Sequence, residues 1–571
     1  MKKIKTSTNR IHMISLSAEQ KNIELMFCST TEQYIVPEYQ RPYSWTFDQC
    51  SDLFRDLKNA YDDKEQYFLG NIILARSKDY DMTGQNFIVD GQQRMITIWM
   101  LIKVLSLFLD DVNTLRSALS IVPWKGSVNE PKIKSLIFEN KDNDAIQKIA
   151  SYTKDLLESR YNELTLKSNI LKENKCETQF EANLLYLYEQ IKYSGLLDDE
   201  NKLTYFAQFL MKRVSMLPIV QTADNEDEAN DKALTIFETI NNRGLDLEDA
   251  DIFKARLYNS AYTEEQRQEF ISQWVDFKSV CNGLGLSIDE VFRYYSHIIR
   301  GRNGVTTSEK RLRDFFTNDS SSPLTYSSYD VVLTDLYKIL DAIKYVKRVS
   351  CEGGFNEPGP WLQILHEYTN QYPIYAIIVY LFNHEVEQPN EKMAFVIFLQ
   401  SLTRYCLYTG STSSVKFGIY PIIKKISQGD AIDDYRRNDI TIETFDHLGR
   451  LKNAYALLAY LLDTKAEIPS KYNIDKIVNL RDEPLLDNKW NYSNINDICN
   501  SLGNLVVLDI PKRYITYKDK YQYYKTSKNI YVSSIFSSPD FSYNDWNMRN
   551  IHMKNLLVDF FSETNNGHFN S

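Results

Sequence analysis

The sequence predicts an α+β protein that is largely helical and is divided into two or three domains. Its 571 residues exceed the ~250–300 residues at which a single hydrophobic core stops growing. Short strand-like runs alternate with helical ones at the start of the chain, and later segments repeat apolar residues at the three- and four-residue spacing of packed helices. An apolar content of 43% with 25% charged residues is typical of soluble globular domains, so sizeable cores are expected.

The first strand-like runs cover residues 34–36, 69–74 and 87–89, and polar turns separate them. This alternation indicates a small α/β domain. A fourth run at residues 214–220 is expected to return to the same domain. Most of residues 101–216 have helical spacing, and we expect the charged stretch at 167–181 to form an exposed helix–loop region.

The rest of the chain is predicted to be mainly helical. Residues 229–258 form helices around a glycine break, and residues 271–426 continue as helices that are interrupted at Gly353–Gly354 and at the P-G-P sequence of 358–360. From about residue 430 the pattern mixes helix with a strand-like run at 505–508. We therefore expect three domains, at residues 15–260, 261–429 and 430–571.

Charge and cysteine content restrict the function classes. The 66 basic and 76 acidic residues give a net charge of −10, which opposes non-specific binding to DNA, so any nucleic-acid contact must be local. The 7 cysteines are scattered and never in C-x-x-C spacing, which predicts neither a disulfide framework nor a zinc site. With no signal-peptide pattern and no apolar run of membrane-spanning length, we expect a cytoplasmic protein without a membrane partner.

The sharpest motif is the D-G-Q-Q-R turn of residues 90–94, which follows the strand-like F-I-V and precedes an apolar helix. Helix N-termini expose unpaired N–H groups, so phosphate is favoured where Gly91 lets the backbone approach closely. Arg94 could contact phosphate, and Asp90 could hold a divalent metal or orient a water. The alternative is that Asp90 caps the helix and Arg94 pairs with a surface acid.

Two further motifs accompany this turn. Residues 36–45, V-P-E-Y-Q-R-P-Y-S-W, could stack a base on Tyr43 or Trp45 while Arg41 meets phosphate, although packing of the aromatic rings in a core explains the same composition. Residues 237–247, F-E-T-I-N-N-R-G-L-D-L, read as a helix stopped by Gly244 and a second helix capped near Asp246.

In order and spacing, these motifs and the Y-F-L-G-N sequence of residues 67–71 resemble the N-terminal domain of the GmrSD family of modification-dependent restriction enzymes and their anti-phage relatives. The resemblance covers roughly residues 20–260. It implies a fold similar to the ParB and sulfiredoxin group and a turn that binds and hydrolyses a nucleoside triphosphate with Mg²⁺. It implies as catalytic residues Asp90, Gln92, Gln93 and Arg94, and as nucleotide-binding residues Gln40, Arg41, Tyr43, Trp45, Gly91, Asn241, Arg243 and Lys254.

The C-terminal residues resemble the His-Asn-His (HNH) nuclease domain of the same family, but in a degenerate form. The G-N-L strand at residues 503–505 is present, whereas the expected I-E-H-I-x-P sequence is replaced by Y-N-I-D-K-I-V-N at 472–479. Lys476 therefore stands where the catalytic His is expected, beside Asp475, and Asn504 belongs to the G-N-L strand. A lysine is normally protonated near neutral pH and is a poor general base, so we expect a nuclease-like domain that does not cut.

A basic and aromatic segment at residues 512–528 is the strongest local patch of this kind, and a tyrosine-rich solvated surface is the alternative interpretation. The nucleic-acid contacts predicted there are Lys512, Arg513, Lys518, Lys520 and Lys525. The first functional hypothesis is a defence protein that hydrolyses a nucleotide and engages DNA or a partner. The others are an active nucleotide-regulated endonuclease and a non-catalytic sensor that regulates a separately encoded effector. The oligomeric state, the nucleotide and the metal ligands stay open.

Overall fold

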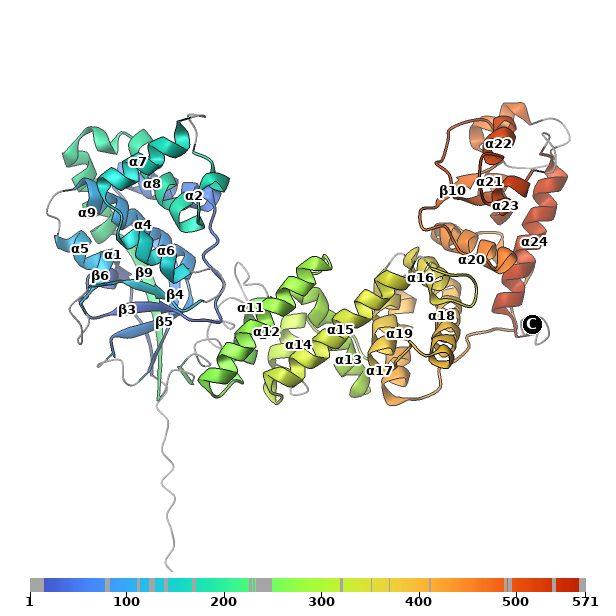
Figure 1. Cartoon of the computed structure of the whole chain (residues 1–571), viewed down its shortest axis with the longest axis horizontal. Helices are drawn as coiled ribbons and strands as arrows, with labels where there is room; N and C mark the ends of the chain where they lie inside the picture. Colours follow the sequence, from blue (N-terminus) through green and yellow to red (C-terminus); the bar gives the residue numbers. More distant parts are fainter. Residues whose placement is uncertain are drawn as a thin grey trace, which may run out of the picture. The chain divides into compact units, whose positions relative to one another are not determined.

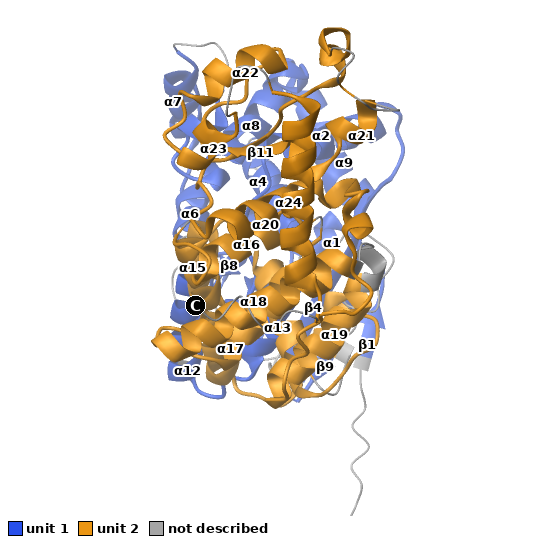
Figure 2. Cartoon of the chain, turned by 90° about the vertical axis from the view of Figure 1, so that its right-hand side faces the viewer, with its two compact units in different colours: residues 1–276 blue, residues 277–571 orange. Residues whose placement is uncertain are grey.

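The computed structural model separates the chain into two compact units, Met1–Asp276 and Phe277–Ser571 (Figure 2). The predicted class is confirmed, because helices dominate and a mixed sheet lies in the first unit. The division into three domains stays a prediction. The structure describes residues 15–77, 83–109, 113–122, 129–137, 142–166, 171–224, 228–229, 232, 249–318, 322–350, 352–368, 370–409, 412–486, 490, 495–536 and 541–563.

A mixed sheet organises the first unit (Figure 1). Its strand order is β1-β9-β4-β5-β3-β8, and β2 also pairs with β9. The pairs β4–β9, β3–β5 and β3–β8 are parallel, while β1–β9 and β4–β5 are antiparallel. The strands are β1 (Ser15–Ala18), β2 (Lys21–Asn22), β3 (Gln33–Val36), β4 (Tyr67–Ser77), β5 (Gln85–Asp90), β8 (Ile133–Ser135) and β9 (Val214–Ala223), with a separate ladder of β6 (Ser120–Ile121) and β7 (Glu130–Pro131). All four strand-like runs predicted for this region are strands of this sheet.

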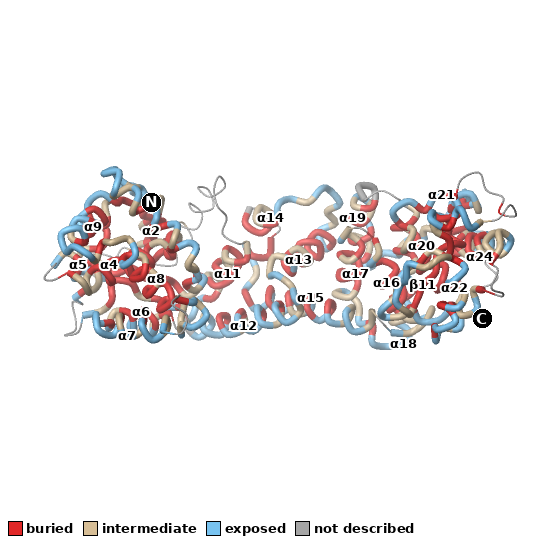
Figure 3. The backbone as a smooth tube through the Cα atoms, turned by 90° about the horizontal axis from the view of Figure 1, so that it is seen from above, coloured by how far each residue is buried: buried red, intermediate tan, exposed pale blue. Residues whose placement is uncertain are grey.

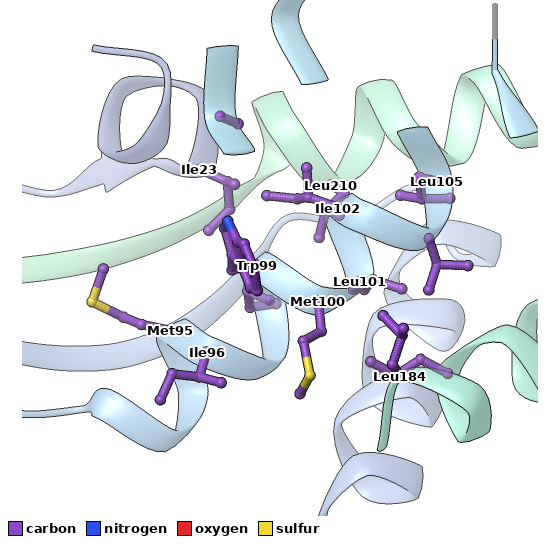
Figure 4. Close-up of a cluster of buried hydrophobic side chains, with 14 of the residues drawn as sticks. Ile23, Met95, Ile96, Trp99, Met100, Leu101, Ile102, Leu105, Leu184 and Leu210 are labelled. Atoms are coloured by element: carbon purple, nitrogen blue, oxygen red, sulfur yellow. The ribbon is translucent and has the colours of Figure 1, made fainter. Parts of the chain in front are cut away.

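Helices gather on one side of the sheet, with α2, α4, α8 and α9 packed against one another (Figure 1). Their shared core centres on Trp99 of α4, whose indole lies among side chains from α1, α8 and α9 (Figure 4). The helices of this region are α1 (Ile23–Phe27), α2 (Phe47–Asp62), α4 (Gln92–Phe108), α5 (Asn113–Leu119), α6 (Asp142–Ala150), α7 (Lys154–Thr165), α8 (Gln179–Tyr193), α9 (Glu200–Arg213), α11 (Asp249–Asn259) and α12 (Glu264–Gly283).

Helix α4 is buried around nearly its whole circumference (Figure 3). Its sequence after the D-G-Q-Q-R turn is apolar at almost every position, and a helix of this kind is stable only when other elements surround it. The Trp99 indole N–H donates to the Leu119 carbonyl at 3.2 Å, so even this polar atom of the core is partnered. The start of α4 is therefore held in a fixed position on the sheet.

The prediction of an exposed region at residues 167–181 is wrong at its C-terminal end. Phe180 and Glu181 lie in the first turn of α8 and are buried. The Glu181 carboxylate accepts hydrogen bonds from Arg160 Nε at 2.9 Å and from the Tyr152 hydroxyl at 3.0 Å. A charge can be buried when it is paired and hydrogen-bonded, and the partners lie too far away in sequence for a local charge pattern to indicate them.

The second unit begins with a bundle of helices. One predicted interruption differs, because the P-G-P sequence of 358–360 forms the first turn of α16. Proline is tolerated there since the first N–H groups of a helix have no intrahelical partner. The helices are α13 (Ile288–Arg302), α14 (Leu312–Asn318), α15 (Tyr329–Val349), α16 (Pro358–His366), α17 (Tyr372–Asn383), α18 (Pro389–Thr409) and α19 (Thr412–Gln428). Within the described ranges, no helix combines the length and the apolar character that crossing a membrane requires.

The C-terminal residues form a small α+β arrangement around an antiparallel pair, β10 (Asn473–Lys476) and β11 (Leu505–Leu508). In this register Lys476 lies opposite Leu505. Aromatic rings including Trp490, Tyr524 and Phe536 form the core beside the hairpin. The surrounding helices are α20 (Lys452–Thr464), α21 (Ile495–Cys499), α22 (Tyr517–Tyr524), α23 (Ile530–Ser534) and α24 (Tyr543–Phe561).

Candidate functional site

The D-G-Q-Q-R motif forms the connection between β5 and α4. Gly91 is the N-cap of α4 and has φ = 93°, a left-handed conformation that favours glycine. A Cβ atom at this position would lie 3.1 Å from Ile72 Cγ1 on β4. The first helical bond runs from Met95 N to the Gly91 carbonyl at 3.0 Å, so the amides of residues 92–94 precede it and are not used inside the helix. The predicted strand–turn–helix geometry is confirmed.

Both glutamines of the motif face inward and bind the backbone of the segment at residues 40–46. Gln93 Oε1 accepts hydrogen bonds from Ser44 N at 2.9 Å and Trp45 N at 3.2 Å, and its Nε2 donates to the Pro42 carbonyl at 3.1 Å. Gln92 Nε2 donates to the Arg41 carbonyl at 2.8 Å. Each glutamine is only 5% exposed. These side chains therefore position the segment, which the motif alone did not indicate.

The same segment is held from the other side by residues that local sequence reasoning missed. Tyr43 is buried, and its hydroxyl contacts Thr97 Oγ1 at 2.7 Å and accepts from Asn183 Nδ2 at 2.9 Å. Asn183 also donates to the Trp45 carbonyl at 2.6 Å. Tyr43 therefore packs in the core, as the alternative interpretation of its motif proposed, while Trp45 is half-buried. Asn183 lies 140 residues along the chain from Tyr43, and no local signal could have found it.

Gln40 completes this network from the strand side. Its Nε2 donates to the carbonyl of Val89, the residue before Asp90, at 3.0 Å. Gln92 Oε1 is the exception in the network, because this buried oxygen has no hydrogen-bond partner among the described residues. A buried acceptor without a donor costs free energy, so this oxygen is available to a bound water or ligand.

The charged members of the motif lie at the edge of this network and reach solvent. Arg94 Nη2 is 3.6 Å from Asp90 Oδ2, and both side chains are 28% exposed. Arg94 Nη1 also donates to the Leu69 carbonyl at 2.8 Å. Leu69 precedes Gly70, where φ is 107° and a Cβ atom would lie 2.3 Å from Arg94 Nη1. The glycine of the Y-F-L-G-N sequence therefore makes room for the Arg94 guanidinium.

Two guanidinium groups and one backbone N–H act on the Asp90 carboxylate. Burial raises its pKa above the usual value of 3.8, and the Arg94 guanidinium, the Gly91 N–H and Arg41 partly oppose this rise. Arg41 itself is exposed. The turn thus combines one carboxylate, two guanidinium groups and a helix N-terminus, a set that matches a phosphate-bearing ligand with its metal ion.

The third motif, residues 237–247, lies outside the described residues. Asn241 and Arg243 lie outside them, whereas Lys254 is buried on α11. The same helix contacts the start of the 36–45 motif, where the Tyr258 hydroxyl donates to Glu38 Oε2 at 3.0 Å. The Tyr39 and Tyr258 rings are 5.7 Å apart. In the described ranges, no group of three or more His, Cys, Asp or Glu residues could hold a metal ion, and the metal ligands stay unknown.

In the C-terminal residues, Asp475 lies on β10 and is buried. Its Oδ2 accepts from Lys520 Nζ at 3.0 Å and from the Tyr524 hydroxyl at 2.8 Å. Lys520 is only 1% exposed, so the prediction that it contacts nucleic acid at the surface is wrong, because its charge neutralises a buried carboxylate. Lys518 and Lys525 are exposed, and Lys525 Nζ donates to the Ser533 carbonyl at 2.6 Å.

The residues predicted to form a degenerate nuclease motif divide into two kinds. Asn504 is buried, accepts from Val478 N at 2.8 Å and donates to the Val478 carbonyl at 2.8 Å, so it fastens the hairpin. Lys476 is half-buried at the end of β10, and its Nζ donates to Asn500 Oδ1 at 3.0 Å. Burial and the nearby Lys452 and Lys512 lower the pKa of Lys476.

The first unit is thus an α/β domain whose strand–turn–helix motif is held in place by two buried glutamines and presents a carboxylate between guanidinium groups. Residues 23–258 match the family model of the GmrSD restriction endonuclease N-terminal domain. Residues 23–258 therefore form a domain of this kind, as the motifs led us to expect. No curated protein matches the chain.

Replacing Gln93 by Ala is expected to release the segment at residues 42–45. The Ser44 and Trp45 amides lose their acceptor, and an unsatisfied buried group costs about 1–3 kcal/mol. Hydrogen exchange of these two amides should therefore accelerate, while that of the middle of α4 stays slow. Gln147→Ala, at an exposed position of α6, is the control. Unchanged exchange at Ser44 and Trp45 would show that Gln93 does not hold the segment.

Replacing Asp90 by Asn is expected to stabilise the protein at neutral pH. The raised pKa of Asp90 means that the charged form is less favourable in the folded chain than in the unfolded chain. The cost is absent below the usual pKa of 3.8 and develops as the pH rises through the folded-state pKa. Calorimetric melting of wild type and Asp90→Asn should therefore converge as the pH falls from about 7 towards about 4. Exposed Asp63→Asn is the control, and a less stable Asp90→Asn at pH ~7 would contradict the sign.

Proposed function

We propose that this protein acts in restriction or anti-phage defence, and that its N-terminal domain binds and hydrolyses a nucleoside triphosphate with Mg²⁺. The observation that carries the proposal is that the side chains of the D-G-Q-Q-R motif fall into a buried group and a solvent-accessible group. Its two glutamines are buried and hold the adjacent segment, while Asp90 and Arg94 reach solvent. A motif that served packing alone would not need a carboxylate and a guanidinium group at a glycine-capped helix start, with a second guanidinium from Arg41 acting on the same carboxylate.

Each residue has a separate role in this proposal. The amides that follow Gly91 and the guanidinium groups of Arg41 and Arg94 would hold phosphate oxygens. Asp90 supplies the carboxylate for Mg²⁺ or for orienting the attacking water, and Mg²⁺ when bound would neutralise phosphate charge. Gln92 and Gln93, expected from the resemblance to be catalytic, act here as positioning residues.

The remaining candidates of the first unit surround this set. Trp45 is the half-buried aromatic ring of the held segment, which makes it the candidate for stacking a base. Gln40 supports the turn through the Val89 carbonyl. Asn241, Arg243 and Lys254 stay candidates through the family motif.

For the C-terminal residues we propose binding of nucleic acid or of a partner without cleavage. This rests on Lys476 at the position of the expected His, and on a neighbouring Asp475 whose carboxylate is already paired with Lys520. The third hypothesis is a sensor that regulates a separate effector. Such a sensor would use the same nucleotide site but would bind the nucleotide without hydrolysing it. Tight nucleotide binding without phosphate release would single it out.

The proposed hydrolysis predicts phosphate release that depends on Asp90 and Arg94. In a malachite-green assay of the full chain with Mg²⁺ and each of the four ribonucleoside triphosphates, Asp90→Ala and Arg94→Ala should lose about 10²-fold or more in rate, as groups that stabilise developing charge do. Gly70→Ala tests positioning, because its Cβ atom would displace the Arg94 guanidinium. Arg55→Ala removes an exposed arginine that also forms a helical ion pair, with Asp52 at 2.6 Å, and should keep the wild-type rate. Equal rates in all variants, or no release from wild type, would refute hydrolysis.

An active endonuclease is the second candidate, and one observation favours it. The lowered pKa of Lys476 brings this amine closer to the neutral form that a general base requires. Plasmid nicking with Mg²⁺ or Mn²⁺ that is lost in Lys476→Ala would establish this candidate, whereas we expect no nicking by wild type. Asn504→Ala is a weaker test, because Asn504 holds the hairpin and its loss would disturb the fold.

A further inference from the structure

A cavity of about 310 Å³ opens beside the β10–β11 hairpin. Four basic side chains and one carboxylate line it, together with an exposed tyrosine. These residues are Lys476, Arg481, Lys512, Arg513, Asp475 and Tyr514. Segments 475–481 and 512–514 are separated in sequence, and the sequence-based patch contained only the second of them.

The cavity is strongly positive although the chain as a whole has a net charge of −10. Asp475 does not offset the four cations, because its carboxylate already accepts from Lys520 Nζ and from the Tyr524 hydroxyl. Lys512 Nζ lies farther from that carboxylate, at 3.9 Å. A cluster of cations in an acidic protein marks a local site for an anionic ligand.

The hydrogen bonds of three of these cations go to neutral acceptors, and the fourth, Arg513, lies against an aromatic ring. Lys476 Nζ donates to Asn500 Oδ1 at 3.0 Å, and Lys512 Nζ donates to the Ile474 carbonyl at 3.4 Å. The Arg513 guanidinium lies 4.5 Å from the centre of the Tyr523 ring. Arg481 donates through Nη2 to the Ile515 carbonyl. Such preorganisation lowers the entropy that these long side chains lose on binding.

Tyr514 adds a feature that a simple anion site does not need. Its side chain is 85% exposed, although a large aromatic residue is usually at least partly covered. It follows Arg513 directly and lines the same cavity. An aromatic face next to cations can stack a base whose phosphate those cations hold, as in proteins that bind single strands. Bases inside a duplex are stacked on each other and cannot reach such a face without being flipped out.

We propose that this cavity binds one nucleotide unit of a single-stranded nucleic acid. The cations Lys476, Arg481, Lys512 and Arg513 take the backbone phosphates, and Tyr514 stacks the adjoining base. The cavity lies at the lower end of the ~300–1,000 Å³ typical of ligand sites, which matches one nucleotide rather than a larger group. The inference rests on the proposed nucleic-acid role of the C-terminal residues, deepens it by naming the substrate class, and is independent of the nucleotide site of the first unit.

Fluorescence anisotropy of the full chain tests this proposal. The probes are a labelled DNA strand of about 12 nucleotides, within the site sizes of single-strand-binding proteins, its RNA equivalent, and the corresponding duplex. The strands should bind more tightly than the duplex. Lys476→Gln and Lys512→Gln should each weaken binding and reduce the slope of log K against log salt by about 0.7. Tyr514→Ala should weaken binding about 5- to 150-fold, and Tyr514→Phe, which keeps the ring, should restore it.

Lys471→Gln and Lys528→Gln are the charge-matched controls, because both lysines are exposed and neither lines the cavity. Equal losses in these controls would replace the site by diffuse charge attraction. Equal affinity for strand and duplex, or no effect of Tyr514→Ala, would overturn the single-strand assignment. If the wild type binds polyglutamate but neither strand, the cavity belongs to an acidic protein partner. No triphosphate is added, so failure here and failure of phosphate release are separate results.

Discussion

The hydrogen bonds between the Gln93 side chain and the backbone of residues 42–45 are the interaction on which the candidate site depends. One amide group satisfies two N–H groups and one carbonyl of a segment that has no regular secondary structure. Buried backbone groups without partners are costly, and Gln93, together with Gln92 and Asn183, supplies those partners to this segment. In turn, the segment presents Arg41 beside Asp90 and Arg94. The glutamines of the motif therefore have a structural role, and the placement of the charged residues depends on it.

The parts of the fold that the sequence could predict are those with strong local signals. The strands around Tyr34, Leu74, Ile88 and Val220 have apolar runs between polar turns, and all four were found in one sheet. Gly91 and the apolar run after it indicated a strand–turn–helix connection, which is confirmed. The match to the family over residues 23–258 agrees with the motifs that first indicated it.

Long-range partners could not be predicted from local patterns. Asn183 joins the site from α8, and Glu181, two residues earlier on that helix, is buried and paired with Arg160. Lys520 is a second example. Its place in a basic segment predicted a contact at the surface, whereas its side chain is buried in an ion pair with Asp475. A lysine looks the same in the sequence whether it lies at the surface or in the interior. Only the presence of a buried carboxylate nearby, which the local sequence does not reveal, distinguishes the two cases.

The burial of α4 has a consequence for how a ligand can be received. A helix enclosed on nearly all sides cannot tilt or slide without opening a packed interior. Adaptation at the turn must therefore come from side-chain rotation of Arg41 and Arg94 and from small movements of the chain near Trp45. Arg94 donates a hydrogen bond to the Leu69 carbonyl, so reorientation of its guanidinium would break or shift a contact with β4. Ligand binding at this turn would therefore be transmitted to the sheet through the Arg94 side chain, while α4 keeps its position.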